Sequence, residues 1–111
     1  MTSNFLEGIV RGIKTYIERD KNDVTMLIVH LYKPSDYFLK EKNIIGISVT
    51  LIYRENEIFP ESEYELGKFY IADDRNYTIF QTFINSLIKE FGEPEIEESL
   101  EYKEEYVFYL E

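Results

Sequence analysis

The most regular hydrophobic pattern in the chain lies between Asn76 and Pro94, and it predicts a helix packed on a core. Apolar residues recur there at spacings of three and one, within an arc of about 140° on a helical wheel. They are Phe80, Phe83, Ile84, Leu87, Ile88 and Phe91. Core packing explains this stripe, and an aromatic ligand pocket is the alternative. The candidate N-terminal caps are Asp74, Asn76 and a capping box from Thr78 to Gln81. Gly92 in the left-handed conformation, followed by Pro94, should end the helix.

A second amphipathic pattern predicts a helix over residues 4–19. Its apolar arc contains Phe5, Leu6, Ile9, Val10, Ile13, Tyr16 and Ile17. Ser3 or Asn4 is the expected cap, with Asn4 and Glu7 at capping-box spacing. Gly8 and Gly12 lie four residues apart at one edge of the arc, where they would let another backbone approach closely. That backbone belongs either to this fold or to a second copy in a dimer.

Alternating apolar residues predict three strands between the two helices. Residues 24–32 place Leu27, Val29 and Leu31 on one face and Val24, Met26 and Ile28 on the other, as expected of a central strand. In residues 44–53, five apolar residues alternate with Gly46, Ser48 and Thr50, which indicates one buried and one mostly wet face. The five are Ile45, Ile47, Val49, Leu51 and Tyr53. Residues 64–71 form the third strand. The connection 33–43 contains Pro34 and Ser35, and Ser35 could cap a single helical turn.

The acidic, aromatic segment after residue 94 has two interpretations. A hairpin within residues 95–111 is one, and it fits the aromatic content of the last strand, which would run from Tyr106 to Leu110. Its first strand would contain Ile96, Glu98, Leu100 and Tyr102, with the turn near Tyr102 to Glu104. A glutamate-rich helix over residues 95–105 is the alternative, because neither glycine nor asparagine marks the turn.

The element order is therefore α-β-β-β-α-β-β, and the expected fold class is α+β. We expect a single domain over residues 1–111, with an antiparallel sheet of about five strands. Both amphipathic helices should cover one face of the sheet. The opposite face should be wet or form an interface.

Charge is distributed unevenly along the chain, whose formal net charge is −10. Residues 1–54 carry +2 and residues 55–111 carry −12. Direct binding to nucleic acid or to an anionic membrane surface is therefore disfavoured, because both need cations. A basic protein partner is favoured, since such a field accelerates encounter with a positive surface.

Composition excludes further classes of protein. Cysteine is absent, which excludes disulfides, thiolate zinc sites and cysteine catalysis. The chain has no apolar run long enough to span a membrane, and its first residues do not resemble a signal peptide. We therefore expect a cytoplasmic protein.

Motifs for catalysis, cofactors and metals are missing from the sequence. The single histidine, His30, follows no serine in a recognisable motif, and we expect it to be packed or hydrogen-bonded at a sheet edge. The glycine spacing forms no phosphate-binding loop, and the acids match no calcium loop. We expect no enzyme, no cofactor and no metal, although a close pair of carboxylates could in principle support acid–base catalysis.

Glutamates interleaved with tyrosines are the distinctive feature of the last 22 residues. In a strand, residues two apart lie about 6.8 Å apart on one face, close to the spacing of phosphates along a nucleic-acid strand. Glu63 and Glu65 have the same spacing as Glu95 and Glu97. The predicted partner-binding residues are Glu95, Glu97, Glu98, Glu101, Tyr102, Glu104 and Glu105. A solvated acidic face that keeps the protein soluble is the simpler explanation.

The sequence thus predicts a small non-enzymatic inhibitor that mimics nucleic acid and binds a nuclease or another basic nucleic-acid-handling protein. A phage or viral antagonist of host defence, such as an anti-CRISPR or anti-restriction protein, is one setting. An immunity protein that neutralises a nuclease toxin is another. A structural or oligomerising subunit, in the simplest case a homodimer, is the alternative. A small-molecule enzyme or binding domain ranks third.

Overall fold

The computed structural model describes residues 2–33, 43–98 and 104–110. Two helices and five strands follow one another in the predicted order. Their bounds are α1 (Thr2–Arg19), β1 (Val24–Tyr32), β2 (Ile44–Tyr53), β3 (Ser62–Ala72), α3 (Asn76–Phe91), β4 (Glu95–Glu97) and β5 (Glu104–Tyr109).

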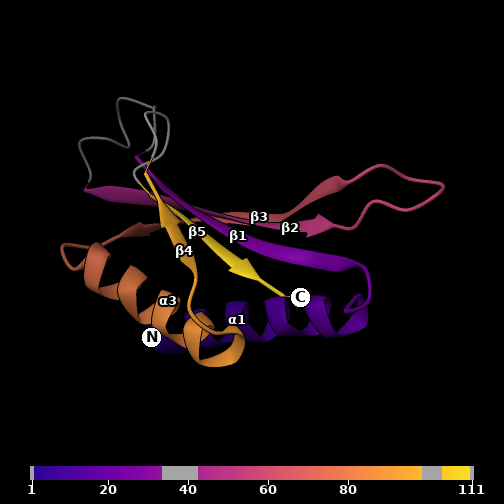
Figure 1. The fold of residues 1–111 in the computed structure, drawn as a ribbon. Helices are drawn as coiled ribbons and strands as arrows, with labels where there is room; N and C mark the ends of the chain where they lie inside the picture. The colour runs from indigo at the N-terminus through magenta and orange to yellow at the C-terminus, as the bar shows by residue number, and fades with distance from the viewer. Residues whose placement is uncertain (1, 34–42, 99–103, 111) are drawn as a thin grey trace.

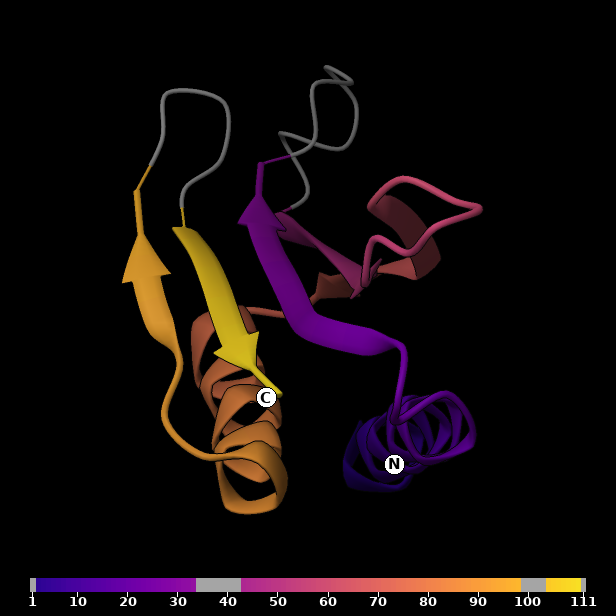
Figure 2. The same ribbon diagram turned by 45° about the vertical axis from the view of Figure 1, so that its right-hand side comes forward.

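The five strands form one antiparallel sheet in the order β3-β2-β1-β5-β4. Both helices lie side by side on the same face of this sheet (Figures 1 and 2). The other face is covered by neither helix. The predicted α+β class, the strand number and the placement of the helices are therefore confirmed, and β1 is central as expected.

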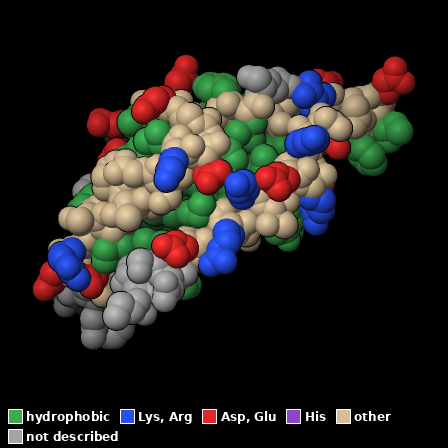
Figure 3. Space-filling model, turned by 90° about the horizontal axis from the view of Figure 1, so that it is seen from below, with side chains coloured by type: hydrophobic (Ala, Val, Ile, Leu, Met, Phe, Trp, Pro, Cys, Tyr) green, Lys and Arg blue, Asp and Glu red, His purple; other side chains and the backbone are tan. Residues whose placement is uncertain are grey.

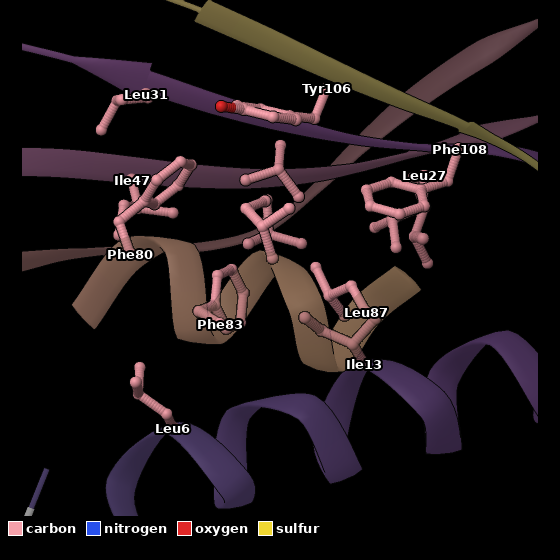
Figure 4. Packing of buried hydrophobic residues seen from close by; sticks show 14 of the residues in the cluster. Leu6, Ile13, Leu27, Leu31, Ile47, Phe80, Phe83, Leu87, Tyr106 and Phe108 are labelled. Atoms are coloured by element: carbon pink, nitrogen blue, oxygen red, sulfur yellow. The ribbon is translucent and has the colours of Figure 1, made fainter. Parts of the chain in front are cut away.

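The core lies between the sheet and the two helices. Phe80, Phe83 and Leu87 of α3 point from the helix toward Tyr106 and Phe108 of β5 (Figure 4). Phe83, Leu87 and Phe108 are completely buried. The regular stripe predicted for α3 is thus a core-packing stripe, since its residues contact the sheet.

The sequence prediction for α1 needs three corrections. The helix begins at Thr2, so residues 3 and 4 lie inside it rather than capping it. Phe5 is 57% exposed, because it lies at the margin of the apolar arc, where its ring meets the edge of Phe69. Gly8 and Gly12 contact nothing within the fold, since a Cβ at either position would find no atom within 4 Å.

The start of α3 also differs from the prediction. Arg75 is the N-cap, without a side-chain capping bond, and Asp73 instead accepts a hydrogen bond from the Arg75 N–H at 2.8 Å. Asn76 is buried and donates from its side chain to the Asn43 carbonyl at 2.9 Å, which ties the helix start to β2. Gly92 ends the helix with φ 89° and ψ −178°, a conformation open only to glycine but not the left-handed helical one.

A bulge in β1 overturns the predicted face of Val24. The pairing with β2 shifts between Val24 and Met26, so Thr25 is an extra residue in the strand. Val24 therefore turns into the core, where it is 1% exposed, instead of sharing a face with Met26 and Ile28.

The predicted wet face of β2 is mostly buried. Ser48, Thr50 and Ile52 are at most 9% exposed, although no helix covers them. Strands flank β2 on both sides, and the ring of Tyr32 lies over Gly46, where a Cβ would come within 2.4 Å of it. Neighbouring side chains thus cover this strand from within the sheet.

The hairpin at the end of the chain is confirmed by the pairing of β4 with β5. The alternative helix is wrong over Glu95–Glu97, which are strand. The predicted turn is wrong at Glu104, which is the first residue of β5 and pairs with Leu31. The other residues of that turn, 102 and 103, and the single turn proposed at Ser35 lie outside the described residues.

Candidate functional site

The candidate site is the sheet face that the helices leave uncovered, which we call the outer face. The strand register places its residues in rows that run across the sheet. One row contains Lys68, Ser48, His30, Glu105 and Glu97, from β3 to β4. The next row contains Glu65, Thr50, Ile28, Val107 and Glu95. Acidic side chains therefore lie at both edges of the outer face, with polar and apolar side chains between them.

Three of the predicted binding residues meet on the β4–β5 side of this face. Glu97 lies directly opposite Glu105, and Glu95 lies opposite Val107, one row away. Because strand residues alternate, all three side chains are on the outer face. We call Glu95, Glu97 and Glu105 the acidic triplet. Glu95 and Glu97 are exposed and Glu105 is partly buried.

Tyr109 holds one member of the acidic triplet in place. Its hydroxyl donates a hydrogen bond to Glu95 Oε2 at 3.1 Å. This bond, together with the negative charge of Glu95, raises the pKa of Tyr109 above its ordinary value. Tyr109 is 54% exposed, so it presents an aromatic ring beside the carboxylates. Tyr109 was not among the predicted partner-binding residues, whose one tyrosine was Tyr102.

His30 is part of the same surface, contrary to the prediction of a sheet-edge position. Its Nε2 lies 3.5 Å from Glu105 Oε1, and its side chain is 18% exposed. It belongs to the central strand β1. Only pairing across strands brings it next to Glu105, because the two residues are 75 positions apart in sequence.

Glu104 is separated from the acidic triplet by the sheet itself. It lies opposite Leu31, on the helix-covered face, and accepts a hydrogen bond from the Tyr106 hydroxyl. The pKa of Tyr106 is raised above its ordinary value, mainly because the phenol is buried and to a smaller degree because of this hydrogen bond. Glu104 therefore has a structural partner and does not share a surface with Glu105.

The other predicted residues are distributed as follows. Glu98 is exposed just after β4 ends. Glu101 and Tyr102 lie outside the described residues, so the structure does not place them.

The opposite edge of the outer face carries Glu63 and Glu65 on β3. A hollow of about 360 Å³ separates them from the centre of the sheet; His30, Ser48, Thr50 and Lys68 are among its lining residues. Glu65 Oε1 lies 3.4 Å from Ser48 Oγ, which donates to it, and 3.9 Å from Lys68 Nζ. The charge of Glu65 is thus partly balanced, whereas no ion pair with lysine or arginine is found for the acidic triplet in the part of the chain that the structure describes.

The helix-covered side of the molecule has a different charge pattern. Seen from below, acidic and basic side chains are interspersed around exposed apolar atoms (Figure 3). Lys14 and Glu90, for example, form an ion pair of 3.2 Å between α1 and α3. Basic side chains are thus interspersed with the acids on the helix-covered side, whereas Glu95, Glu97 and Glu105 form no ion pair with lysine or arginine among the described residues.

Residues 2–33, 43–98 and 104–110 contain no group of three or more histidine, aspartate or glutamate side chains arranged to hold a metal ion. None of their helices is long and apolar enough to cross a membrane. The chain matches no protein-family model, no curated protein and no solved structure.

Proposed function

We propose that this protein is a non-enzymatic inhibitor that binds a basic, nucleic-acid-handling protein, such as a nuclease, through the β4–β5 edge of its outer face. The observation that carries the proposal is the acidic triplet, in which three carboxylates from two adjacent strands share one uncovered surface. The target meets this surface in the cytoplasm.

The geometry of the triplet resembles a short run of phosphates. Glu95 and Glu97 are two residues apart in β4, which separates them by about 6.8 Å, and adjacent strands lie about 4.8 Å apart. A groove that binds the backbone of a nucleic acid uses lysine and arginine to neutralise its row of phosphates. Carboxylates at these positions form charge-assisted hydrogen bonds with guanidinium groups.

Two neighbouring side chains favour binding over simple solvation. Tyr109 orients Glu95, and His30 lies within 3.5 Å of Glu105, so these acids are held in place before a partner arrives. Preorganised side chains lose less conformational entropy when a complex forms. The exposed ring of Tyr109 supplies apolar contact of the kind that anchors protein interfaces.

The test compares two variants of equal charge. One variant carries Glu95→Gln, Glu97→Gln and Glu105→Gln. The control carries Glu7→Gln, Glu18→Gln and Glu90→Gln on the two helices, where all three acids are exposed. Each changes the net charge by the same three units, so only the position of the charge differs. Both are used with the native chain as tagged bait in a lysate of a candidate host, with DNA or RNA as competitor.

The proposal predicts that the native chain and the control capture the same nucleic-acid-binding protein. The triplet variant should lose it, and added DNA or RNA should displace it. Equal capture by both variants would contradict the proposal, as would a partner that nucleic acid does not displace. The captured protein also distinguishes an antagonist of host defence from an immunity protein, since the latter recognises a nuclease toxin.

A further inference from the structure

The second edge of the sheet, β3, has the properties of a strand prepared to pair. It is 11 residues long, about 36 Å at strand geometry, and only β2 flanks it in the part of the chain that the structure describes. Most of its side chains are exposed, and Tyr64 and Tyr70 are each about half exposed. An edge strand with an unpaired row of backbone N–H and C=O groups is a template for another strand.

An apolar groove runs beside this strand, between β3 and α1. Its volume is about 320 Å³, and its lining includes Phe5, Ile9, Gly12, Leu66 and Phe69. Gly12 contributes no side chain, and a Cβ there would meet nothing within 4 Å. Both the strand edge and the groove are therefore open on the same side of the molecule.

The sequence of β3 is complementary to itself in an antiparallel register centred between Leu66 and Gly67. In that register, Glu65 lies opposite Lys68 of a second copy, and this pair occurs twice. Tyr64 lies opposite Phe69, and Leu66 lies opposite the small Gly67. Opposite charges would thus meet directly, and a large side chain would meet a glycine.

In this register, two residues that lie opposite each other must be on the same face of the sheet. Glu65 and Lys68 meet that condition only because β3 contains a bulge. Its pairing with β2 shifts between Val49 and Thr50, so Leu66 is an extra residue between Glu65 and Gly67. Glu65 and Lys68 therefore both lie on the outer face, opposite Thr50 and Ser48. Without the bulge, residues three apart would lie on opposite faces.

Tyr64 and Phe69, which would lie opposite each other in the dimer, are also on the same face of β3. Tyr64 and Phe69 lie opposite Leu51 and Ile47, on the helix-covered face beside the groove. Because of the bulge, every residue from 62 to 71 lies opposite a residue on the same face of the second copy. No other antiparallel register of β3 with itself matches faces over so long a stretch.

We propose that the protein forms a symmetric homodimer by antiparallel pairing of β3 with β3 of a second copy, which joins the two sheets into one of ten strands. The partner's apolar side chains at this edge contact the groove between α1 and β3. The acidic triplet lies at the opposite edge of the sheet and stays uncovered in this dimer. The homodimer and the proposed inhibitory binding therefore use different surfaces, and a failure of one proposal leaves the other intact.

Sedimentation equilibrium of the native chain up to millimolar concentration is the first test. We expect a monomer–dimer equilibrium that goes no further than the dimer, because pairing covers both β3 edges. A chain that remains monomeric throughout this range would overturn the proposal, as would assembly that continues beyond a dimer.

Charge exchange then tests the register. Lys68→Glu alone, or Glu65→Lys alone, places like charges opposite each other twice and should weaken dimerisation at least about tenfold. The double variant Glu65→Lys/Lys68→Glu restores opposite charges in the same register, and its dimerisation should return to the native level. Circular dichroism of each variant checks that the fold is intact.

Mixing the two single variants gives the sharpest outcome. Neither should form a strong dimer alone, but an equimolar mixture should form a heterodimer, since lysines of one chain then face glutamates of the other. A mixture that stays monomeric, or a double variant as weak as the singles, would overturn this register. Dimers of native strength in all variants would place the contact elsewhere on the molecule and would also overturn it.

Discussion

The two edges of this sheet differ in nearly every property that controls whether a strand attracts another. β3 has 11 residues and exposed aromatic rings, and it lies beside an apolar groove. A bulge usually opposes edge pairing, but here it brings Glu65 and Lys68 to the same face. β4 has three residues, and two of them are glutamates of the acidic triplet. Short length and charge are the devices by which proteins keep edge strands from pairing. The same sheet therefore has one edge suited to strand pairing and another suited to electrostatic contact.

The β4 edge should be dispensable for folding, whereas its hairpin partner β5 is not. Phe108 of β5 is completely buried, and Ile96 of β4 is 59% exposed. Phe108→Ala should reduce the free energy of unfolding by about 3–5 kcal/mol, because it removes a core ring and leaves a cavity. Ile96→Ala should change it by less than about 0.5 kcal/mol. Urea denaturation of both variants measures the contrast, and comparable losses would show that β4 has a structural role.

The connection from α3 into β4 depends on Gly92, which has a backbone conformation that only glycine readily adopts. Gly92→Ala should lower the free energy of unfolding by about 1–3 kcal/mol, because its φ of 89° with extended ψ is closed to alanine. Thermal unfolding followed by circular dichroism is the measurement. If this variant were as stable as the native chain, the connection would have a second accessible conformation.

Tyr106→Phe tests the bond that holds Glu104 on the helix-covered side of the hairpin. The free energy of unfolding at neutral pH should fall by about 1 kcal/mol, the usual net value of one hydrogen bond. The native pKa of Tyr106 is raised above the ordinary value of 10.0, so its stabilising contribution is complete below pH 10 and is lost as pH rises further.

Denaturation in urea at several pH values above 10 checks this sign. The native chain should lose stability more steeply than the phenylalanine variant across that window. Parallel curves would mean that the phenol of Tyr106 titrates alike in the folded and unfolded chains.

The smallest expected effect is a gain in stability from a substitution in α1, at the groove beside β3. Gly12→Ala should stabilise the monomer by about 0.5–1 kcal/mol, since the position is helical and open space surrounds it. Gly8→Ala is the matched control, because Gly8 is equally unhindered but does not line the groove. Only the Gly12 variant should also weaken dimerisation, as measured by sedimentation. Equal effects of the two variants on dimerisation would separate the groove from the interface.

The candidate site was predictable in composition but not in arrangement. Glutamates two apart indicate a charged strand face, and Glu95 and Glu97 confirm that pattern. The split between Glu104 and Glu105 was not foreseen, although adjacent strand residues must face opposite sides. The sequence alone did not show which side the core would take. His30 could not be assigned to this surface either, because its neighbour Glu105 is far away along the chain.

The sequence by itself determined the element order, the strand and helix bounds to within a few residues, and the buried stripe of α3. Periodicity encodes these features locally, since 3.6-residue and two-residue repeats are visible within a dozen positions. Only the tertiary structure decided which strands lie at the edges, where Val24 points and that Gly8 and Gly12 face open space. Those features depend on strand pairing and on bulges, which join residues distant in sequence and shift the alternation of faces by one residue.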